Sequence, residues 1–167
     1  METKEKIKVF LVDDDNMFIK ALKHQLSKGK TNIEIIAFPT GEECVQNLHQ
    51  KPALIVLDYN LNSNYPDAMD GIEVLKKIKQ KAPDTEVIML SSQDNIEVAM
   101  DTLRNGAYDY IAKGESCFIK IQNIIRHITD EILYSENVNK ESKRDRIIGT
   151  VVIIILVIII FLRNILS

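Results

Sequence analysis

The chain has 167 residues and a formal net charge of −3 at neutral pH, from 21 basic and 24 acidic residues. This length is enough for one domain of ordinary size and an appendage, and the near balance of charge gives no support for nucleic-acid binding. The two cysteines, Cys44 and Cys117, lie far apart and lack metal-ligand spacing. We therefore expect reduced thiols rather than a disulfide framework or a zinc site.

Short apolar runs alternate along the chain with segments whose apolar residues recur at helical spacing. The apolar runs predict strands at 7–12, 33–38, 53–57, 87–90 and 108–112. The segments between and after them predict helices at 16–28, 40–50, 72–81, 96–103 and 119–133. Five strands that alternate with helices indicate an α/β fold with a parallel sheet, covered by helices on both faces and joined by right-handed crossovers.

Polar residues stand where four of these strands end. Asp13 and Asp14 follow the first strand, Asp58 follows the third, Ser91 the fourth and Lys113 the fifth. The carboxyl ends of parallel strands gather at one edge of the sheet, and ligands bind there. We therefore expect three carboxylates, a hydroxyl and an amine to meet at one site.

These residue types favour magnesium and phosphoryl chemistry. Mg²⁺ prefers hard oxygen ligands, and carboxylates that repel one another favour a divalent cation. Asp58, alone at the end of a central strand, is placed to act as a nucleophile. Lys113 supplies a point positive charge for a phosphoryl oxygen, and the Ser91 hydroxyl can donate to another.

With these residues in order, the chain resembles a response-regulator receiver domain of two-component signalling over about residues 5 to 130. The matching pieces are Leu11-Val12-Asp13-Asp14-Asp15, Leu57-Asp58, Asp70-Gly71, Leu90-Ser91 and Lys113. The resemblance implies a flavodoxin-like, doubly wound sheet of five parallel strands. It also implies a signalling protein that is not a turnover enzyme, although it catalyses its own phosphorylation and dephosphorylation.

By this resemblance, Asp58 accepts a phosphoryl group from a phosphohistidine on a sensor histidine kinase or a histidine phosphotransfer protein. Asp14, Asp58 and the backbone carbonyl of Asn60 would bind Mg²⁺ directly, and Asp13 would act through water. Ser91 and Lys113 would hold phosphoryl oxygens. Tyr110 matches the aromatic residue that moves inward when the hydroxyl shifts to the phosphoryl group. A homodimer is a further possibility that the resemblance raises.

The chain departs from the family pattern near the site. An insertion at about 62–68 lengthens the loop after Asp58, next to the site where a partner would approach. Gly114 stands where the family usually has a proline in cis, and a non-proline cis bond costs about 2.5–4 kcal/mol, so a trans peptide is expected. Asp15 adds a third acid, which leaves Asp14-Asp15 as an alternative metal-binding pair.

The end of the chain differs from the rest. Residues 134–146 are polar and charged, a pattern that fits a linker or an extension of the preceding helix. Residues 147–166 are almost wholly aliphatic and reach about the 20 residues that a membrane span needs, so we expect a transmembrane helix there. Four basic residues precede that segment, namely Lys140, Lys143, Arg144 and Arg146. This bias predicts a membrane protein with a single C-terminal anchor and a cytoplasmic receiver domain at 1–133.

Two other functions fit parts of the pattern. A phosphatase of the haloacid dehalogenase type also uses an aspartyl nucleophile, Mg²⁺, a hydroxyl and a lysine, with Asp13 and Asp15 as its paired acids. That family needs further acids after the lysine, which this sequence does not supply on a suitable strand end. The second alternative is a receiver-like scaffold that works without phosphorylation.

Overall fold

The computed structural model describes residues 6–28, 32–61, 68–92 and 95–166, and from residue 136 onward it describes only the side chains of 138, 142–151, 153 and 154. The chain divides into two compact units, residues 1–126 and residues 127–167. The first unit contains the sheet and the candidate site. The second contains most of the last helix.

The first unit is built on a sheet of five parallel strands in the order β2-β1-β3-β4-β5. The strands are β1 (Ile7–Val12), β2 (Ile33–Phe38), β3 (Leu54–Asp58), β4 (Glu86–Ser91) and β5 (Asp109–Ala112). The central strand β3 is buried along its whole length, as expected for a parallel sheet covered on both faces. The predicted α/β fold with five parallel strands is confirmed.

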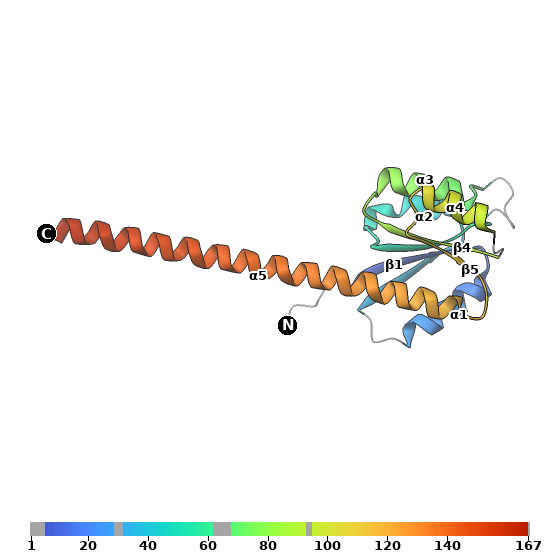
Figure 1. Ribbon diagram of the computed structural model, residues 1–167, viewed down its shortest axis with the longest axis horizontal. Coiled ribbons are helices and arrows are strands. Elements are labelled where there is room, and N and C mark those ends of the chain that lie inside the picture. The colour runs from blue at the N-terminus through green and yellow to red at the C-terminus, as the bar shows by residue number, and fades with distance from the viewer. Residues whose placement is uncertain (1–5, 29–31, 62–67, 93–94, 167) are drawn as a thin grey trace. The chain divides into compact units, whose positions relative to one another are not determined.

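Helices cover both faces of the sheet (Figure 1). They are α1 (Asn16–Ser27), α2 (Gly41–Gln46), the 3₁₀ helix η1 (Leu48–Gln50), α3 (Gly71–Lys81), α4 (Ile96–Arg104) and α5 (Cys117–Leu166). α1 and the first turns of α5 lie on one face, where Gln25 and Gln122 are hydrogen-bonded at 3.5 Å. α2, α3 and α4 lie on the other face. This arrangement is the doubly wound architecture expected from the sequence.

The core beneath α2 and α3 explains why these helices form. The apolar side of α3 buries Val74, Leu75 and Ile78 against the sheet. Opposite them, β1 contributes Phe10, whose ring packs edge-on against Phe38 with centroids 4.8 Å apart. Full burial of one such side chain is worth about 1.5–3 kcal/mol. The predicted helix at 40–50 is shorter in the structure, since α2 ends at Gln46 and the 3₁₀ helix η1 continues it.

α4 is held differently from α3. Its one buried residue is Thr102, and within the described part of the chain the Thr102 hydroxyl has no hydrogen-bond partner. The apolar residues Ile96, Met100 and Leu103 are exposed by 75%, 47% and 47%. Gly106, with φ of +93°, then turns the chain toward β5, a left-handed conformation that glycine adopts without steric cost.

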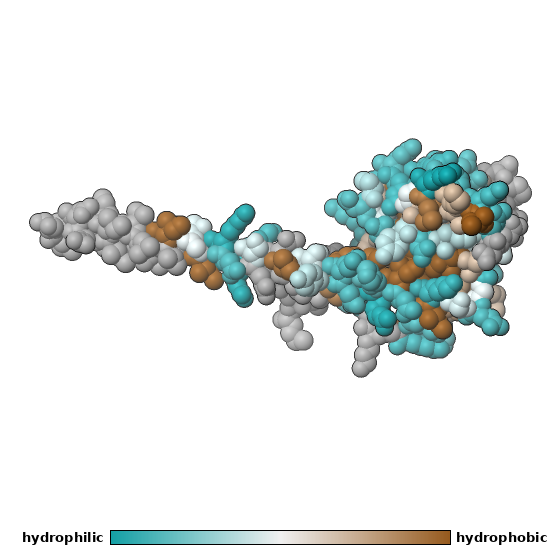
Figure 2. All heavy atoms as spheres, viewed as in Figure 1, coloured by the Kyte–Doolittle hydropathy of each residue, from teal (hydrophilic) through white to brown (hydrophobic). Residues whose placement is uncertain are grey.

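The end of the chain bears on two predictions. α5 is one continuous helix from Cys117 to Leu166, so residues 134–146 extend the helix rather than form a loop. No helix in the described residues is long and apolar enough to cross a membrane, and the predicted transmembrane helix at 147–166 is therefore not supported. Among the described side chains, exposed aliphatic residues from Ile147 to Ile154 follow a charged stretch, seen as brown after teal in Figure 2.

Candidate functional site

The polar residues predicted at the strand ends lie at one edge of the sheet. Asp13 directly follows β1, Asp58 ends β3, Ser91 ends β4, and Lys113 directly follows β5. Register keeps the ends level, because Asp58 pairs with Leu90 and Ser91 pairs with Ala112. Asp13, Asp58 and Ser91 are nearly inaccessible, with 3%, 3% and 2% of their surface exposed.

Three aspartates form a carboxylate cluster at this edge. One carboxylate oxygen each from Asp13, Asp14 and Asp58 lies within 4.8 Å of the others. Asp15 has a different task, because its side chain caps α1 by accepting the amides of Met17 and Phe18 at 2.8 and 3.1 Å. The structure thus brings Asp13 and Asp14 together with Asp58 and uses the third consecutive acid to begin a helix.

Lys113 joins the buried acids. Its ammonium donates a hydrogen bond to Asp13 Oδ2 at 2.8 Å and forms an ion pair with Asp58 Oδ1 at 2.8 Å. Its backbone amide donates to the carbonyl of Ser91 at 2.7 Å, which fixes the chain where β5 ends. A lysine one hundred positions after Asp13 therefore lies against it, as expected if both stand at the same sheet edge.

Burial and charge act in opposite directions on these groups. Burial raises the pKa of Asp58 above its ordinary value, and Lys113 opposes that rise through its hydrogen bond and charge. Burial likewise raises the pKa of Asp13, with a further rise from the charge of Asp58. Burial alone would lower the pKa of Lys113, but its contacts with the two carboxylates outweigh this effect, and the pKa is raised. The lysine therefore stays charged at neutral pH.

Gly71 lets α3 begin against the backbone of the site. The Gly71 amide donates to the carbonyl of Tyr59 at 3.0 Å, and the Tyr59 amide donates to the carbonyl of Leu90 at 2.8 Å. A Cβ at position 71 would lie 2.5 Å from the carbonyl oxygen of Asp58. Asp70 completes this start with a capping box, in which its side chain accepts the Glu73 amide while Glu73 accepts the Asp70 amide.

The other predicted residues lie around this cluster. The Asn60 backbone amide donates to the Asp58 carboxylate, which opposes the rise in the Asp58 pKa. Tyr110 lies in β5, half-buried, and packs against the core beneath α2 and α3. No cis peptide bond occurs in the described residues, so Lys113–Gly114 is trans. Most of the predicted insertion, residues 62–67, lies outside the described residues.

Two aromatic residues at the site escaped the sequence analysis. The Phe18 ring centroid lies 4.7 Å from Lys113 Nζ, and the Phe118 ring lies beside it with centroids 5.2 Å apart. Phe18 stands among the apolar residues of the helical pattern in α1, which marks it only as a packing residue. The usable signal is its place three residues after Asp15, in the first turn of a helix that begins at the site.

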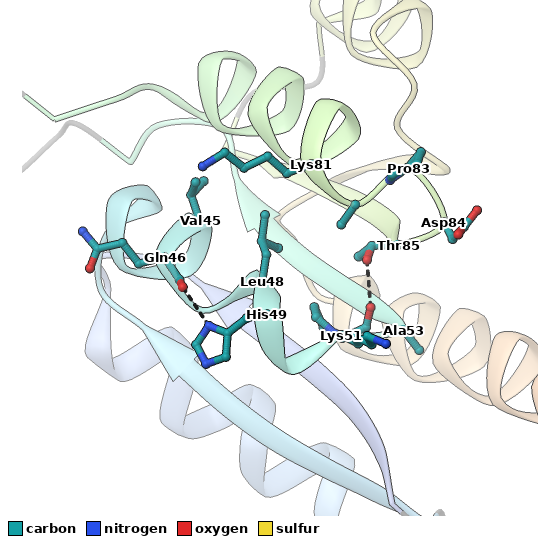
Figure 3. Close-up of a pocket in the computed structure, with 12 residues that line it drawn as sticks. Val45, Gln46, Leu48, His49, Lys51, Ala53, Lys81, Pro83, Asp84 and Thr85 are labelled. Atoms are coloured by element: carbon teal, nitrogen blue, oxygen red, sulfur yellow. Dashed lines mark hydrogen bonds between the residues drawn. The ribbon is translucent and has the colours of Figure 1, made fainter.

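A cavity lies elsewhere in the first unit (Figure 3). It has a volume of about 750 Å³ and includes Lys51, Ala53 and Thr85 in its lining. These residues directly precede β3 and β4, so the cavity lies at the amino ends of the strands, opposite the carboxylate cluster. The Thr85 hydroxyl donates a hydrogen bond to the Pro52 carbonyl at 2.8 Å, drawn in Figure 3 as the dashed line from Thr85. The cavity is therefore separate from the candidate site.

The donor set fits a divalent cation such as Mg²⁺. The described cluster holds three carboxylates, and Lys113 forms ion pairs with Asp13 and Asp58, so a divalent cation would balance the remaining negative charge. Carboxylate oxygens are the ligands that Mg²⁺ prefers, and a few suffice because the ion keeps several waters. Burial is the main cause of the raised pKa values of Asp13 and Asp58, and the charge of a neighbouring carboxylate raises each further.

Comparison with known proteins identifies relatives of this arrangement. The response regulator receiver domain family matches residues 9–128. A protein-glutamate methylesterase/protein-glutamine glutaminase of Clostridium acetobutylicum is 34% identical over 143 residues, which cover 81% of this chain and 39% of that protein. Its counterpart in Thermotoga maritima is 30% identical over 134 residues, covering 77% and 37%. The chain thus spans about two fifths of the length of these relatives.

Solved structures give the same result. The receiver domain of a putative LuxO repressor from Vibrio parahaemolyticus superposes with a TM-score of 0.68 at 25% identity, covering 80% of this chain and 97% of that one. The BeF₃-activated receiver domain of DrrB superposes with a TM-score of 0.64 at 26% identity, covering 75% and 98%. Both align with most of this chain.

Proposed function

The chain belongs to the response regulator receiver domain family, and we propose that it accepts a phosphoryl group on Asp58 from a phosphohistidine of a sensor histidine kinase or a histidine phosphotransfer protein. The observation that carries this proposal is the contact of Lys113 with two buried carboxylates, at 2.8 Å from each, beside a third in the same cluster. This arrangement combines a nucleophile, a cation site and a fixed positive charge.

The transfer moves one phosphoryl group between two residues. An ionised oxygen of Asp58 forms a bond to phosphorus, the phosphorus–nitrogen bond of the phosphohistidine breaks, and the imidazole leaves with that electron pair. The product is an acyl phosphate at Asp58. Because Asp58 is 3% exposed, fixed charges act on the reacting atoms with little competition from water. The Lys113 ammonium favours the ionised Asp58 that the reaction needs.

Asp13, Asp14, Asp58 and the Asn60 carbonyl would hold Mg²⁺, the first of these through water. The bound ion neutralises charge on the phosphoryl oxygens. The chain's own residues do the rest: Lys113 holds one phosphoryl oxygen, and Ser91 donates its hydroxyl to another. The new group adds close to two negative charges and three acceptor oxygens, which we propose draws Ser91 toward Asp58 and Tyr110 inward behind it.

The test is incubation of the full chain with acetyl phosphate and Mg²⁺. We expect hydroxylamine-labile phosphate on the wild type and on Asp84→Asn, and none above background on Asp58→Asn. Asp84 is the matched control because it is an exposed acid at the opposite edge of the sheet. A wild type that gains no more phosphate than Asp58→Asn would overturn the proposal.

The phosphatase alternative is not favoured by the geometry, because Asp15 caps α1 rather than pairing with Asp13 in the cluster. Steady hydrolysis of a phosphate ester that depends on Asp13 and survives Asp58→Asn would reverse this ranking. A phosphorylation-independent scaffold would instead keep its cellular effect when Asp58 is replaced by Asn.

A further inference from the structure

The Phe18 ring makes a third contact with the Lys113 ammonium, beside the two carboxylates. Its centroid lies 4.7 Å from Lys113 Nζ, well inside the range of about 6 Å at which a cation is attracted to a ring face. The lysine side chain is 18% exposed, and partial removal from water strengthens that attraction. Lys113 is therefore held by two charged partners and one uncharged partner.

The contact with Phe18 matters because the two carboxylates that also hold Lys113 take further partners in the proposed reaction. Under the proposed function, the carboxylates of Asp13 and Asp58 bind a divalent cation, and Asp58 then carries the phosphoryl group. Both events weaken the ion pairs that hold Lys113, since a second cation repels the ammonium and competes for the same oxygens. The aromatic ring keeps its attraction for the ammonium throughout, because neither event changes it.

Phe18 is itself held at both ends. Its backbone amide donates to the Asp15 carboxylate at 3.1 Å, within the cap of α1. Its ring packs against Phe118 with centroids 5.2 Å apart and planes inclined by 53°, a tilted geometry typical of favourable aromatic pairs. Phe118 follows the buried Cys117, whose amide donates to the carbonyl of Gly114 at 3.1 Å. The ring thus has a fixed position over Lys113.

Backbone hydrogen bonds hold the chain on both sides of Lys113 but do not hold its side chain. The Lys113 amide donates to the Ser91 carbonyl at 2.7 Å, and the Gly114 carbonyl accepts the Cys117 amide at 3.1 Å. A Cβ at Gly114 would have nothing within 4 Å, so the residue after the lysine adds no packing contact. A lysine on a long flexible stem therefore depends on contacts of its own side chain for the position of its ammonium.

We propose that Phe18 is a positioning residue for phosphoryl transfer: its ring, braced by Phe118, keeps the Lys113 ammonium in the site when the carboxylates take other partners. This inference rests on the proposed function of the same site. Under this inference Asp15 also contributes to the reaction indirectly, because its cap fixes the first turn of α1, which carries Phe18.

The first experiment measures where the lysine is, whether or not phosphate is transferred. The amine of Lys113 is labelled with an acylating reagent at saturating Mg²⁺, and the rate is read by mass spectrometry of the full chain. We expect labelling of Lys113 to rise about 3- to 10-fold in Phe18→Leu, the effect of losing one partly desolvated cation–π contact. Met17→Leu is the matched control, because the neighbouring Met17 side chain is 74% exposed.

The second experiment measures phosphorylation by acetyl phosphate in the same variants. We expect Phe18→Leu to slow it by about 3- to 10-fold and Phe18→Trp, which restores a ring face, to recover most of the rate. A role in packing alone would not be restored by the larger indole. If Phe18→Leu does not fold, Phe118→Leu replaces it, and the same direction of change is expected for both readouts.

These experiments distinguish a failure of the positioning role of Phe18 from a failure of the proposed phosphoryl transfer. Labelling of Lys113 in Phe18→Leu that equals the Met17→Leu control would overturn the positioning role. Failure of the wild type to take up phosphate, with labelling still raised in Phe18→Leu, would overturn the proposed function and support the contact between Phe18 and Lys113. A phosphorylation rate in Phe18→Trp as low as in Phe18→Leu would also overturn the role assigned to the ring.

Discussion

Replacing Gly71 by alanine tests whether the start of α3 supports the site. A Cβ at this position would lie 2.5 Å from the carbonyl oxygen of Asp58, 2.7 Å from Tyr59 Cα and 2.9 Å from the Tyr59 carbonyl oxygen. All three are backbone atoms, so no side chain can rotate away to relieve the contact. Either the first turn of α3 or the end of β3 has to move.

The geometry sets the size of the effect. Ordinary van der Waals contact begins at 3.4 Å, so the two backbones must separate by about 0.9 Å, the difference between 3.4 and 2.5 Å. Overpacking of this kind costs about 1–3 kcal/mol. The same movement stretches the hydrogen bond from the Gly71 amide to the Tyr59 carbonyl, now 3.0 Å long, whose loss costs about 1 kcal/mol. We therefore expect the free energy of unfolding to fall by about 3 kcal/mol.

The assay is urea denaturation of the full chain, followed by the near-ultraviolet circular dichroism of its aromatic side chains. Gly114→Ala is the matched control, because nothing lies within 4 Å of its added Cβ. There we expect no loss, or a gain of about 0.4–1 kcal/mol from the reduced freedom of the unfolded chain. Two variants whose midpoints agree would refute the reasoning, since the argument requires a loss of stability in Gly71→Ala and none in Gly114→Ala.

Three further predictions concern the acids and a buried thiol. Asp13 and Asp58 have raised pKa values in the folded chain, so they bind protons more tightly when folded, and the stability they contribute below pH about 4 is lost as the pH rises through those raised values. In buffer with chelator, the wild type should therefore lose unfolding free energy relative to Asp58→Asn as the pH rises above about 4, and a difference that does not change with pH would contradict the expectation. Asp15→Ala should cost about 1 kcal/mol through the lost helix cap but weaken Mg²⁺ binding, measured by calorimetry, less than Asp14→Asn does; the reverse order would place Asp15 at the metal. Burial raises the pKa of Cys44 to about 12, so in a Cys117→Ala variant a thiol reagent at pH 8 should react only as the chain unfolds, and rapid reaction of the folded protein would show that Cys44 is accessible.

The fold was predictable because local pattern and global architecture agree. The strand predicted at 7–12 is β1 within the same bounds, and 33–38 is β2. The helix predicted at 40–50 is the exception, because the chain tightens into a 3₁₀ turn and then passes through Lys51 with φ of 54°. No periodicity signals such a turn, since side chains cannot show where a helix changes its hydrogen-bond spacing.

The residues that the order of strands brings to one edge of the sheet could be predicted from the sequence. Residues that end parallel strands must meet, so Asp13, Asp58 and Lys113 could be grouped from the sequence alone. The choice between Asp13-Asp14 and Asp14-Asp15 depends on helix capping, which places Asp15 outside the carboxylate cluster. For Phe18 the sequence offered one signal, its place in the first helical turn after Asp15, but whether its ring lies over an ammonium depends on side-chain directions that spacing does not report. The membrane prediction used hydropathy alone, and the described residues give it no support.

The way α4 is anchored sets the free energy at which it can move. The one buried side chain of α4 is Thr102, whose hydroxyl has no hydrogen-bond partner among the described residues. The helix therefore gains little from packing on the sheet, because burying such a hydroxyl costs about 1–3 kcal/mol. Its amides should exchange with solvent deuterium through local opening, at a far smaller free energy than those of β3. If Ser91 moves toward Asp58, as proposed, we expect α4 to shift its position more readily than α3, which buries Val74, Leu75 and Ile78.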